Sequence, residues 1–358
     1  MIRKQINRAF TVYFLVSLGI GVLVANWRLS LISTLASSDY IEMELLEKVT
    51  FSNSFLITAY AAFLLAILST LNDVFVFKRI FKKRSLGKYL VLTTVFQLIT
   101  IGVVILVMSR AIAFFILGDE KEYLYLIDRL PDKGHFVLLM FFMIAVSRFL
   151  LEVDRKLGYG NLWKMLSGRF YEPYKERRLF MFLDLKSSTS IAEKVGHYKF
   201  SQLIQDCFKD LYVIEEFGAE VYQYVGDEVV ISWRAHLGLK KSNYIKAFKA
   251  FKEKLDQKGE EYEKKYGLRP VFKAGAHIGE CTVAEVGELK REICYHGDTL
   301  NTSSRIQEMC NPLDSEFLIS ETLFQETEKN PDCEFEEKGE VSLKGKKTEV
   351  KLYKVNCL

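Results

Sequence analysis

Four long apolar segments in the first half of the chain constrain its fold more than any other sequence feature. They are AFTVYFLVSLGIGVLVANW, SFLITAYAAFLLAILSTL, YLVLTTVFQLITIGVVILVM and HFVLLMFFMIAVSRFLLEV. Each is long enough, or nearly so, to cross a bilayer as a helix. We therefore predict an α-helical membrane domain of four transmembrane helices over residues 1–152, with the lipid bilayer as its partner.

The charges that flank these segments predict the orientation of the domain. The segments MIRKQINR and FKRIFKKRSLGK are basic, whereas DYIEMELLEK and GDEKEYLYLIDRLPDKG lean acidic. Because short cytoplasmic loops retain Lys and Arg, this alternation places both termini in the cytoplasm and indicates an integral protein of the inner or plasma membrane. No Ala-x-Ala cleavage site follows the first apolar run, which disfavours a signal peptide.

The net charge of +4 does not indicate a nucleic-acid partner. Much of the excess lies beside the apolar segments, where topology and anionic lipid head groups explain it. The six cysteines all follow the last apolar segment and show no C-x-x-C spacing. They predict neither disulfides nor a structural zinc site.

The second half of the chain has the pattern of an α+β domain. A charged, Gly-containing linker over residues 153–177 precedes the strand LFMFLDL, and the domain then covers residues 178–358. We predict helices at 190–215, 242–266 and 299–311. Strands are expected in VYQYVGDEVVIS, VFKAGAHIG, EICYHG and the C-terminal stretch.

Two aspartates stand at the ends of predicted strands. Asp227 lies in a Gly-Asp hairpin turn, and Asp184 ends an apolar strand that small hydroxyl residues and a helix follow. A strand-to-helix turn offers backbone N–H groups to phosphate, and a carboxylate beside it can hold the accompanying magnesium. Each aspartate alone also fits a turn or helix cap, but together they favour metal binding.

Three further residues complete a candidate phosphate-transfer site. Asn301 and Arg305 lie four residues apart on one face of the helix predicted after CYHGD. Arg can stabilise charge on a phosphoryl oxygen, and Asn can orient a sugar oxygen. Lys344, in SLKGKK, could meet a polyphosphate, although an exposed basic turn is the commoner meaning of such a run.

The region from about Leu179 to Lys354 resembles the class III nucleotidyl cyclase catalytic domain, which adenylyl and guanylyl cyclases share. The pieces that carry the resemblance are FLDLKSSTSIAE, YQYVGDEVV, GAHIGECTVAEVG, HGDTLNTSSRIQ and SLKGK. Each piece is weak alone, but their order and spacing are specific. The resemblance covers the C-terminal half only.

This resemblance implies a ferredoxin-like fold and roles for individual residues. Asp184 and Asp227 would bind two Mg²⁺ or Mn²⁺ ions per active site, with the Leu185 carbonyl as a further ligand. Asn301 and Arg305 would be the transition-state pair, and Lys344 would contact the terminal phosphates. Because metal-binding and base-reading residues of one site come from opposite chains in this family, a homodimer is implied.

The base is selected at two positions where this sequence departs from the family pattern. Gln223 stands where adenylyl cyclases usually carry Lys and guanylyl cyclases Glu, and Cys294 stands where guanylyl cyclases carry Cys. Gln hydrogen-bonds to either base, so it discriminates poorly. We expect ATP as the preferred nucleoside triphosphate, with GTP possible.

Four alternatives to an adenylate cyclase follow from the same features, with unequal support. The chain could be a guanylate cyclase, or a non-catalytic membrane receptor that only binds nucleotide, although the intact set of Asp, Asn, Arg and Lys argues against the receptor. A diguanylate cyclase lacks support because its acidic signature loop is missing from YVGDEVV. A transporter is weaker still, because the apolar segments carry few charges.

Overall fold

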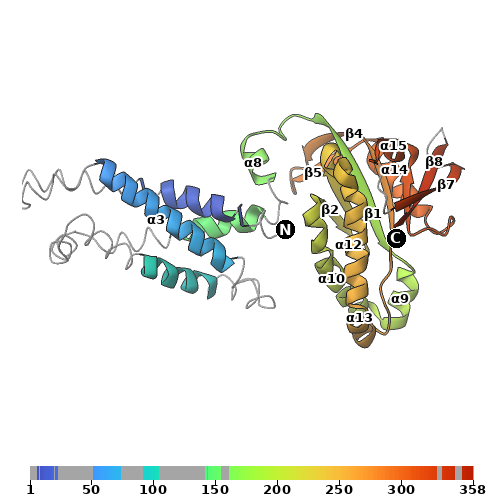
Figure 1. Ribbon diagram of the computed structural model, residues 1–358, viewed down its shortest axis with the longest axis horizontal. Helices are drawn as coiled ribbons and strands as arrows, with labels where there is room; N and C mark the ends of the chain where they lie inside the picture. The colour runs from blue at the N-terminus through green and yellow to red at the C-terminus, as the bar shows by residue number, and fades with distance from the viewer. Residues whose placement is uncertain are drawn as a thin grey trace, which may run out of the picture. The chain divides into compact units, whose positions relative to one another are not determined.

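The computed structural model of the chain divides into two compact units, Met1–Lys156 and Leu157–Leu358. Figure 1 colours the chain from blue at the N-terminus to red at the C-terminus. The structure describes residues 6–7, 9–19, 21–22, 51–73, 92–104, 142, 144–154, 161–328, 333–342 and 349–357.

The first unit is helical wherever it is described. It contains α3 (Phe51–Leu71) and helical backbone at 9–19, 92–104 and 144–154. Leu65, Ile101 and Ile144 meet in one apolar cluster, so three of these segments pack together. Within the described ranges, no helix is both long enough and apolar enough to cross a membrane. The prediction of four spans is therefore not confirmed, and parts of all but the second apolar segment lie outside those ranges.

A buried polar network runs through this unit. The Arg148 side chain is 6% exposed, and its Nη1 donates to Asp73 Oδ1 at 2.6 Å. Its Nη2 donates to Gln97 Oε1 at 3.4 Å, and Gln97 in turn donates to the hydroxyl of Ser69. The sequence did not predict this buried ion pair, which joins Arg148 of the fourth apolar segment to Asp73, just after the second.

The second unit is built on an eight-stranded sheet among its described residues, with the order β2-β3-β1-β4-β6-β8-β7 and β5 paired with β4. The strands are β1 (Tyr174–Leu185), β2 (Glu220–Val225), β3 (Glu228–Arg234), β4 (Phe272–Val286), β5 (Glu292–His296), β6 (Phe317–Ser320), β7 (Cys333–Val341) and β8 (Val350–Cys357). The first four form an antiparallel β2-β3-β1-β4 sheet joined as βαββαβ. This topology confirms the predicted α+β, ferredoxin-like core.

Two of the long helices predicted for this unit are each divided into shorter helices. They are α8 (Asn161–Leu166), α9 (Ser188–Val195), α10 (His197–Asp210), α11 (Ala235–Leu239), α12 (Asn243–Gln257), α13 (Gly259–Tyr266), α14 (Asp298–Glu308) and α15 (Glu321–Glu326), with 3-10 turns η3 (Leu211–Phe217) and η4 (Lys240–Ser242). The single helix predicted at 190–215 is wrong because Gly196, with φ of 81°, separates α9 from α10. The helix predicted at 242–266 is likewise two helices, α12 and α13, which meet at Lys258.

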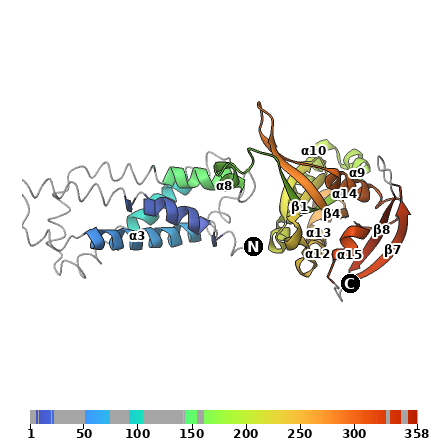
Figure 2. The same cartoon turned by 90° about the horizontal axis from the view of Figure 1, so that it is seen from above.

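Strand β1 is central because apolar residues occupy both of its faces. Leu179, Met181 and Leu183 join the main core with residues of α10, α12 and α13, the helices that Figure 1 places over one face of the sheet. Phe180 and Phe182 pack on the other face against a second cluster. Figure 2 shows the β4 and β5 hairpin, in orange, extending beyond the sheet. Asp184 is the acidic side chain that follows the buried apolar run of this strand.

Candidate active site

The β2–β3 hairpin brings Asp227 to the end of β1. Strand β2 ends at Val225 and pairs with Glu228 at the start of β3, so Gly226 and Asp227 form a two-residue turn. Gly226 has φ of 62°, a value that residues with a Cβ rarely adopt. This confirms the predicted hairpin. On the other side of β3, Glu228 pairs in register with Asp184, which places three carboxylates at one edge of the sheet.

The electrostatics of this edge are those of crowded like charges. Burial first, and then the neighbouring Asp227 carboxyl, raise the pKa of Asp184 to about 6. Burial also raises the pKa of Glu228 to about 7, with Asp184, Asp227 and Glu308 adding to the effect. Both shifts disfavour the ionised forms. The site therefore holds negative charge that an external cation would relieve.

The donor set fits a magnesium-like ion. Among the described residues no cluster of three or more His, Cys, Asp or Glu side chains forms a metal cage. Mg²⁺ rarely needs one, because it is usually held by one or two carboxylates together with substrate phosphates and water. Asp184 and Asp227 supply such a pair. Leu185 is buried and pairs with Phe272, and its backbone N–H donates to the Asp184 carboxylate, which lowers the pKa of that group.

A tight turn follows β1. Ser187 adopts a left-handed backbone conformation, with φ of 58°, and α9 begins at the next residue. A positive φ at a residue other than glycine costs free energy and is found most often at functional sites. The turn has the strand-to-helix geometry that the sequence predicts for a phosphate site.

Helix α14 carries Asn301 and Arg305, and two glycines of β4 let it lie close to the sheet. A Cβ at Gly275 would stand 2.1 Å from the backbone nitrogen of Gln307, and one at Gly279 would stand 2.6 Å from Thr299 Oγ1. Thr299 Oγ1 also donates to the Glu280 carbonyl at 2.6 Å. The helix is therefore pressed against β4, the strand beside β1.

The two predicted functional residues of α14 differ in exposure. Asn301 is exposed, whereas the Arg305 side chain is 35% exposed and pairs with Glu308. At the end of the helix, Lys273 donates from Nζ to Asn311 Oδ1 at 2.8 Å. Lys273 is the β4 residue that pairs in register with Asp184 on β1. Its ammonium group nevertheless donates to Asn311, in the turn after α14.

Two residues of the site escaped the sequence analysis. Gln307 donates from Nε2 to Asp184 Oδ2 at 3.3 Å, and Glu228 is one of the crowded carboxylates. The sequence signal for Glu228 was present, because it follows Asp227 directly. Gln307 had no local signal, because it lies 123 residues from its partner.

Comparison with known proteins assigns the second unit to a family. A model described as the adenylate and guanylate cyclase catalytic domain matches residues 171–357, just over half of the 358 residues. The chain belongs to this family. The cyclase domain therefore accounts for the sheet, for α14 and for the carboxylates at the end of β1.

Two curated relatives place the cyclase domain among enzymes of both base specificities. The chain is 31% identical over 199 residues to adenylate cyclase 2 of Rhizobium meliloti (strain 1021), an alignment that covers 55% of each protein. It is 27% identical over 183 residues to guanylyl cyclase C of Mus musculus, which covers 50% of this chain and 17% of that protein. The chain thus spans about half the length of the first relative.

A solved structure supports the fold. The structure of a bacterial light-regulated adenylyl cyclase matches with a TM-score of 0.54 and 16% identity, over 64% of this chain and 67% of that one. At this identity the likeness concerns the fold alone.

The predicted base-reading residues lie on β2 and β5 of the cyclase domain. Gln223 is exposed on β2, and Cys294 is partly buried on β5 beside Tyr222. The rings of Tyr222 and Tyr295 meet at 4.9 Å between centroids, which brings these strands together. Lys344 lies outside the described residues, so its predicted contact with phosphate stays a prediction.

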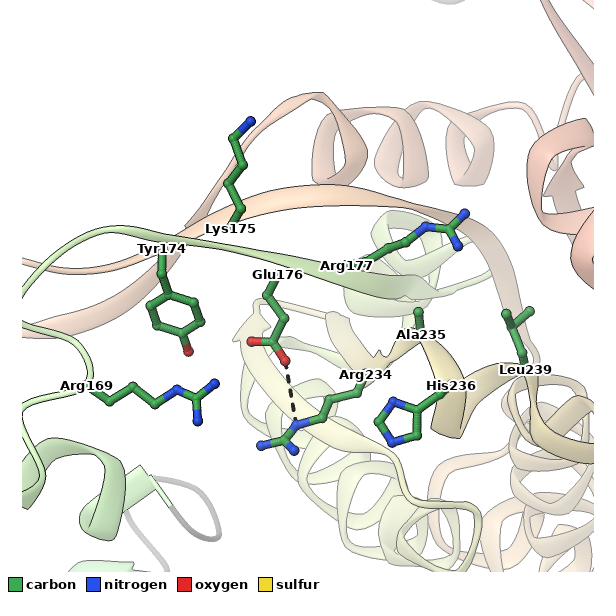
Figure 3. Close-up of a pocket in the computed structure, with 9 residues that line it drawn as sticks. All are labelled: Arg169, Tyr174, Lys175, Glu176, Arg177, Arg234, Ala235, His236 and Leu239. Atoms are coloured by element: carbon green, nitrogen blue, oxygen red, sulfur yellow. Dashed lines mark ion pairs between the residues drawn. The ribbon is translucent and has the colours of Figure 1, made fainter.

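A separate cleft lies at the opposite end of β1 from Asp184. It has a volume of about 440 Å³, and in Figure 3 the side chains of Arg169, Tyr174, Glu176 and Arg234 lie on one side of the strand, whereas that of Lys175 points away. Arg169, Tyr174, Glu176, Arg177, Arg234 and His236 are among the residues that line it. Arg234 forms an ion pair with Glu176 at 3.6 Å. Because it begins at the other end of the strand, this cleft is not part of the carboxylate site.

Proposed function

We propose that the protein is an adenylate cyclase that converts ATP into 3′,5′-cyclic AMP and pyrophosphate. The observation that carries this proposal is the crowding of Asp184, Asp227 and Glu228 at the end of β1, in a chain that also carries Asn301 and Arg305 on α14. The intact set of Asp184, Asp227, Asn301 and Arg305 argues against a non-catalytic nucleotide-binding protein.

In this mechanism Asp184 and Asp227 hold two Mg²⁺ or Mn²⁺ ions, with the Leu185 carbonyl as a further ligand. When bound, such ions activate the ribose 3′-hydroxyl and neutralise phosphate charge. Arg305 donates to the phosphoryl oxygens as negative charge develops on them, and Asn301 orients the ribose. Lys344 would contact the terminal phosphates and offset the negative charge that develops on the pyrophosphate leaving group.

The preference for ATP is the finer part of the proposal. The higher identity to an adenylate cyclase supports ATP, whereas Cys294 and the similarity to a guanylyl cyclase favour GTP as the alternative substrate. Gln223 can hydrogen-bond to either base. The test supplies ATP and GTP separately, with Mn²⁺, to the purified full-length protein and identifies the product by mass spectrometry. Formation of cyclic GMP alone would show a guanylate cyclase instead. Absence of any cyclic product would contradict both the adenylate cyclase and the guanylate cyclase proposals.

We further propose that the enzyme works as a homodimer in which each site draws residues from both chains. In the family, metal-binding and base-reading residues come from opposite chains. We place the transition-state residue Arg305 with the base-reading set, so Asp227 and Arg305 of one chain would serve different sites. Co-expressed Asp227→Ala and Arg305→Ala chains, each inactive alone, should then recover part of the activity. Heterodimers without any recovery would contradict shared sites.

Residues 1–152 are proposed to anchor the enzyme in a membrane, with the catalytic domain and both termini in the cytoplasm. The support is the sequence, with its four apolar segments and the alternating charge between them. The linker over 153–177, with Gly158 and Gly160 outside the described residues, would connect the anchor to the cyclase domain. The test is fractionation: the full chain should stay with membranes washed in alkaline carbonate, and residues 157–358 should not.

A further inference from the structure

The side chain of Gln307 is buried against the sheet, whereas that of Arg305, two residues earlier on α14, is partly exposed. Gln307 is 8% exposed, against 35% for the Arg305 side chain two residues earlier. Its Nε2 donates to Asp184 Oδ2 at 3.3 Å. This hydrogen bond joins the helix of the proposed transition-state residues to a proposed metal-binding carboxylate on β1.

The backbone around Gln307 leaves its side chain little choice of position. A Cβ at Gly275 would come within 2.1 Å of the Gln307 nitrogen, so the helix lies against β4 at this residue. Gly275 pairs with Phe182, two residues before Asp184 on β1. Lys273 also holds the turn that follows the helix, through Asn311. The reach from Gln307 to Asp184 is therefore set by packing at both points.

The chemistry of an amide suits this position. The carboxylate of Asp184 lies among Asp227 and Glu228, so a hydrogen bond to one of its oxygens stabilises the ionised form that a metal requires. A Lys or Arg at 307 would supply a fixed cation that competes with the metal ion. A neutral donor orients the carboxylate without that competition.

We propose that Gln307 is a positioning residue that orients Asp184 for the metal ions of the cyclase reaction. The inference rests on the proposed function of the site. Residues that hydrogen-bond to a metal ligand from behind typically change metal affinity or activity by about 10- to 100-fold when they are replaced. Gln307 meets that description, and the family roles assigned above to Asp184, Asn301 and Arg305 do not include it.

The test replaces Gln307 by Met, which keeps the length and helix preference of the side chain and removes the donor. Binding of Mn²⁺ is measured on the full-length protein by the electron paramagnetic resonance signal of free Mn²⁺. The measurement includes 3′-deoxy-ATP, which lacks the attacking hydroxyl. We expect the Mn²⁺ dissociation constant of Gln307→Met to rise about tenfold or more. The Mn²⁺ concentration for half-maximal activity should rise with it, whereas KM for ATP at saturating Mn²⁺ should stay near that of the wild type.

Ser303→Ala is the matched control. Ser303 is buried on the same helix and donates to the Thr299 carbonyl at 2.9 Å, so its loss perturbs α14 without touching Asp184. It should bind Mn²⁺ like the wild type. In an Asp184→Asn background, Gln307→Met should weaken Mn²⁺ binding no further, because the oxygen it orients no longer carries the charge.

An unchanged Mn²⁺ dissociation constant in Gln307→Met would overturn the inference, as would an equal loss in Ser303→Ala. Should Gln307→Met fail to fold, Gln307→Leu replaces it in the same measurements. A wild-type protein that bound no Mn²⁺ with nucleotide, or formed no cyclic product, would instead contradict the proposed function. The two failures are thus distinguishable.

Discussion

The buried ion pair of the helical unit and the carboxylate site of the cyclase domain arrange charge in opposite ways. In the helical unit, Asp73 and Arg148 are both nearly inaccessible and neutralise each other at 2.6 Å. In the cyclase domain, Asp184, Asp227 and Glu228 crowd together, and the pKa of two of them is raised by burial and mutual repulsion. The first arrangement is complete in itself. The second is suited to a ligand that brings positive charge.

This contrast separates a structural use of charge from a functional one. A buried pair costs desolvation free energy that its attraction offsets only when both partners remain. Crowded carboxylates store unfavourable free energy that a bound cation can recover. Neutralising one charge should therefore destabilise the helical unit but stabilise the cyclase domain in the absence of metal.

The largest effect is expected at the catalytic carboxylates. Asp227→Asn should lower cyclase activity by more than the roughly 100-fold upper range for loss of an outer-shell partner, because it removes a proposed direct ligand. Its unfolding midpoint in EDTA should equal or exceed that of the wild type. Activity assays with Mn²⁺ and thermal unfolding in EDTA measure the two quantities. Asp256→Asn, at an exposed aspartate of α12, is the control and should change neither. Near wild-type activity in folded Asp227→Asn would remove the metal assignment.

The next effect concerns the buried pair of the helical unit. Arg148→Met should lower the free energy of unfolding by about 3 kcal/mol, because it leaves Asp73 buried without its cation. The double variant Asp73→Asn, Arg148→Met should recover much of that loss. Denaturant unfolding of the full chain in mild detergent, followed by circular dichroism, gives both values. Equal stability of wild type and Arg148→Met would mean that Asp73 does not depend on this partner.

These two sites also differ in how far the sequence could predict them. The Gly226-Asp227 hairpin and the end of β1 followed from turn chemistry and period-two patterns, which are local. The Asp73–Arg148 pair joins residues 75 apart, and the Gln307 hydrogen bond joins residues 123 apart. No local pattern encodes such contacts, because they depend on how helices pack. The break at Gly196 did have a local signal, since an isolated glycine weakens a predicted helix.

A smaller effect is expected where α14 meets β4. Gly275→Ala should lower the free energy of unfolding by about 2 kcal/mol and reduce activity, because its Cβ would overlap the backbone of Gln307 and displace the helix of Asn301 and Arg305. Gly259→Ala is the matched control, since its Cβ would meet only the flexible Arg269 side chain at 3.3 Å. Denaturant unfolding and cyclase assays compare the two variants. Full activity in Gly275→Ala would show that the position of α14 does not limit catalysis.

The smallest effect is expected in how the free energy of unfolding depends on pH, through the carboxyl groups of Asp184 and Glu228. The pKa of Asp184 rises from 3.8 to about 6, and that of Glu228 from 4.5 to about 7. The folded state therefore binds more protons than the unfolded state between about pH 4 and pH 7. Stability in EDTA falls as pH rises through this window and levels off above it.

Because both groups are half-buried, solvent screening reduces the contribution of Asp184 to about 1 kcal/mol. The comparison that isolates it is the difference in unfolding free energy between Asp184→Asn and wild type, measured by urea denaturation in EDTA at several pH values. The variant should gain stability over the wild type as pH rises from about 4 to 7. Saturating Mn²⁺ should reverse the order at pH 8, because only the wild type keeps both ligands. A difference that does not vary with pH would mean that neither burial nor the neighbouring carboxyl groups raise the pKa of Asp184 in the folded protein.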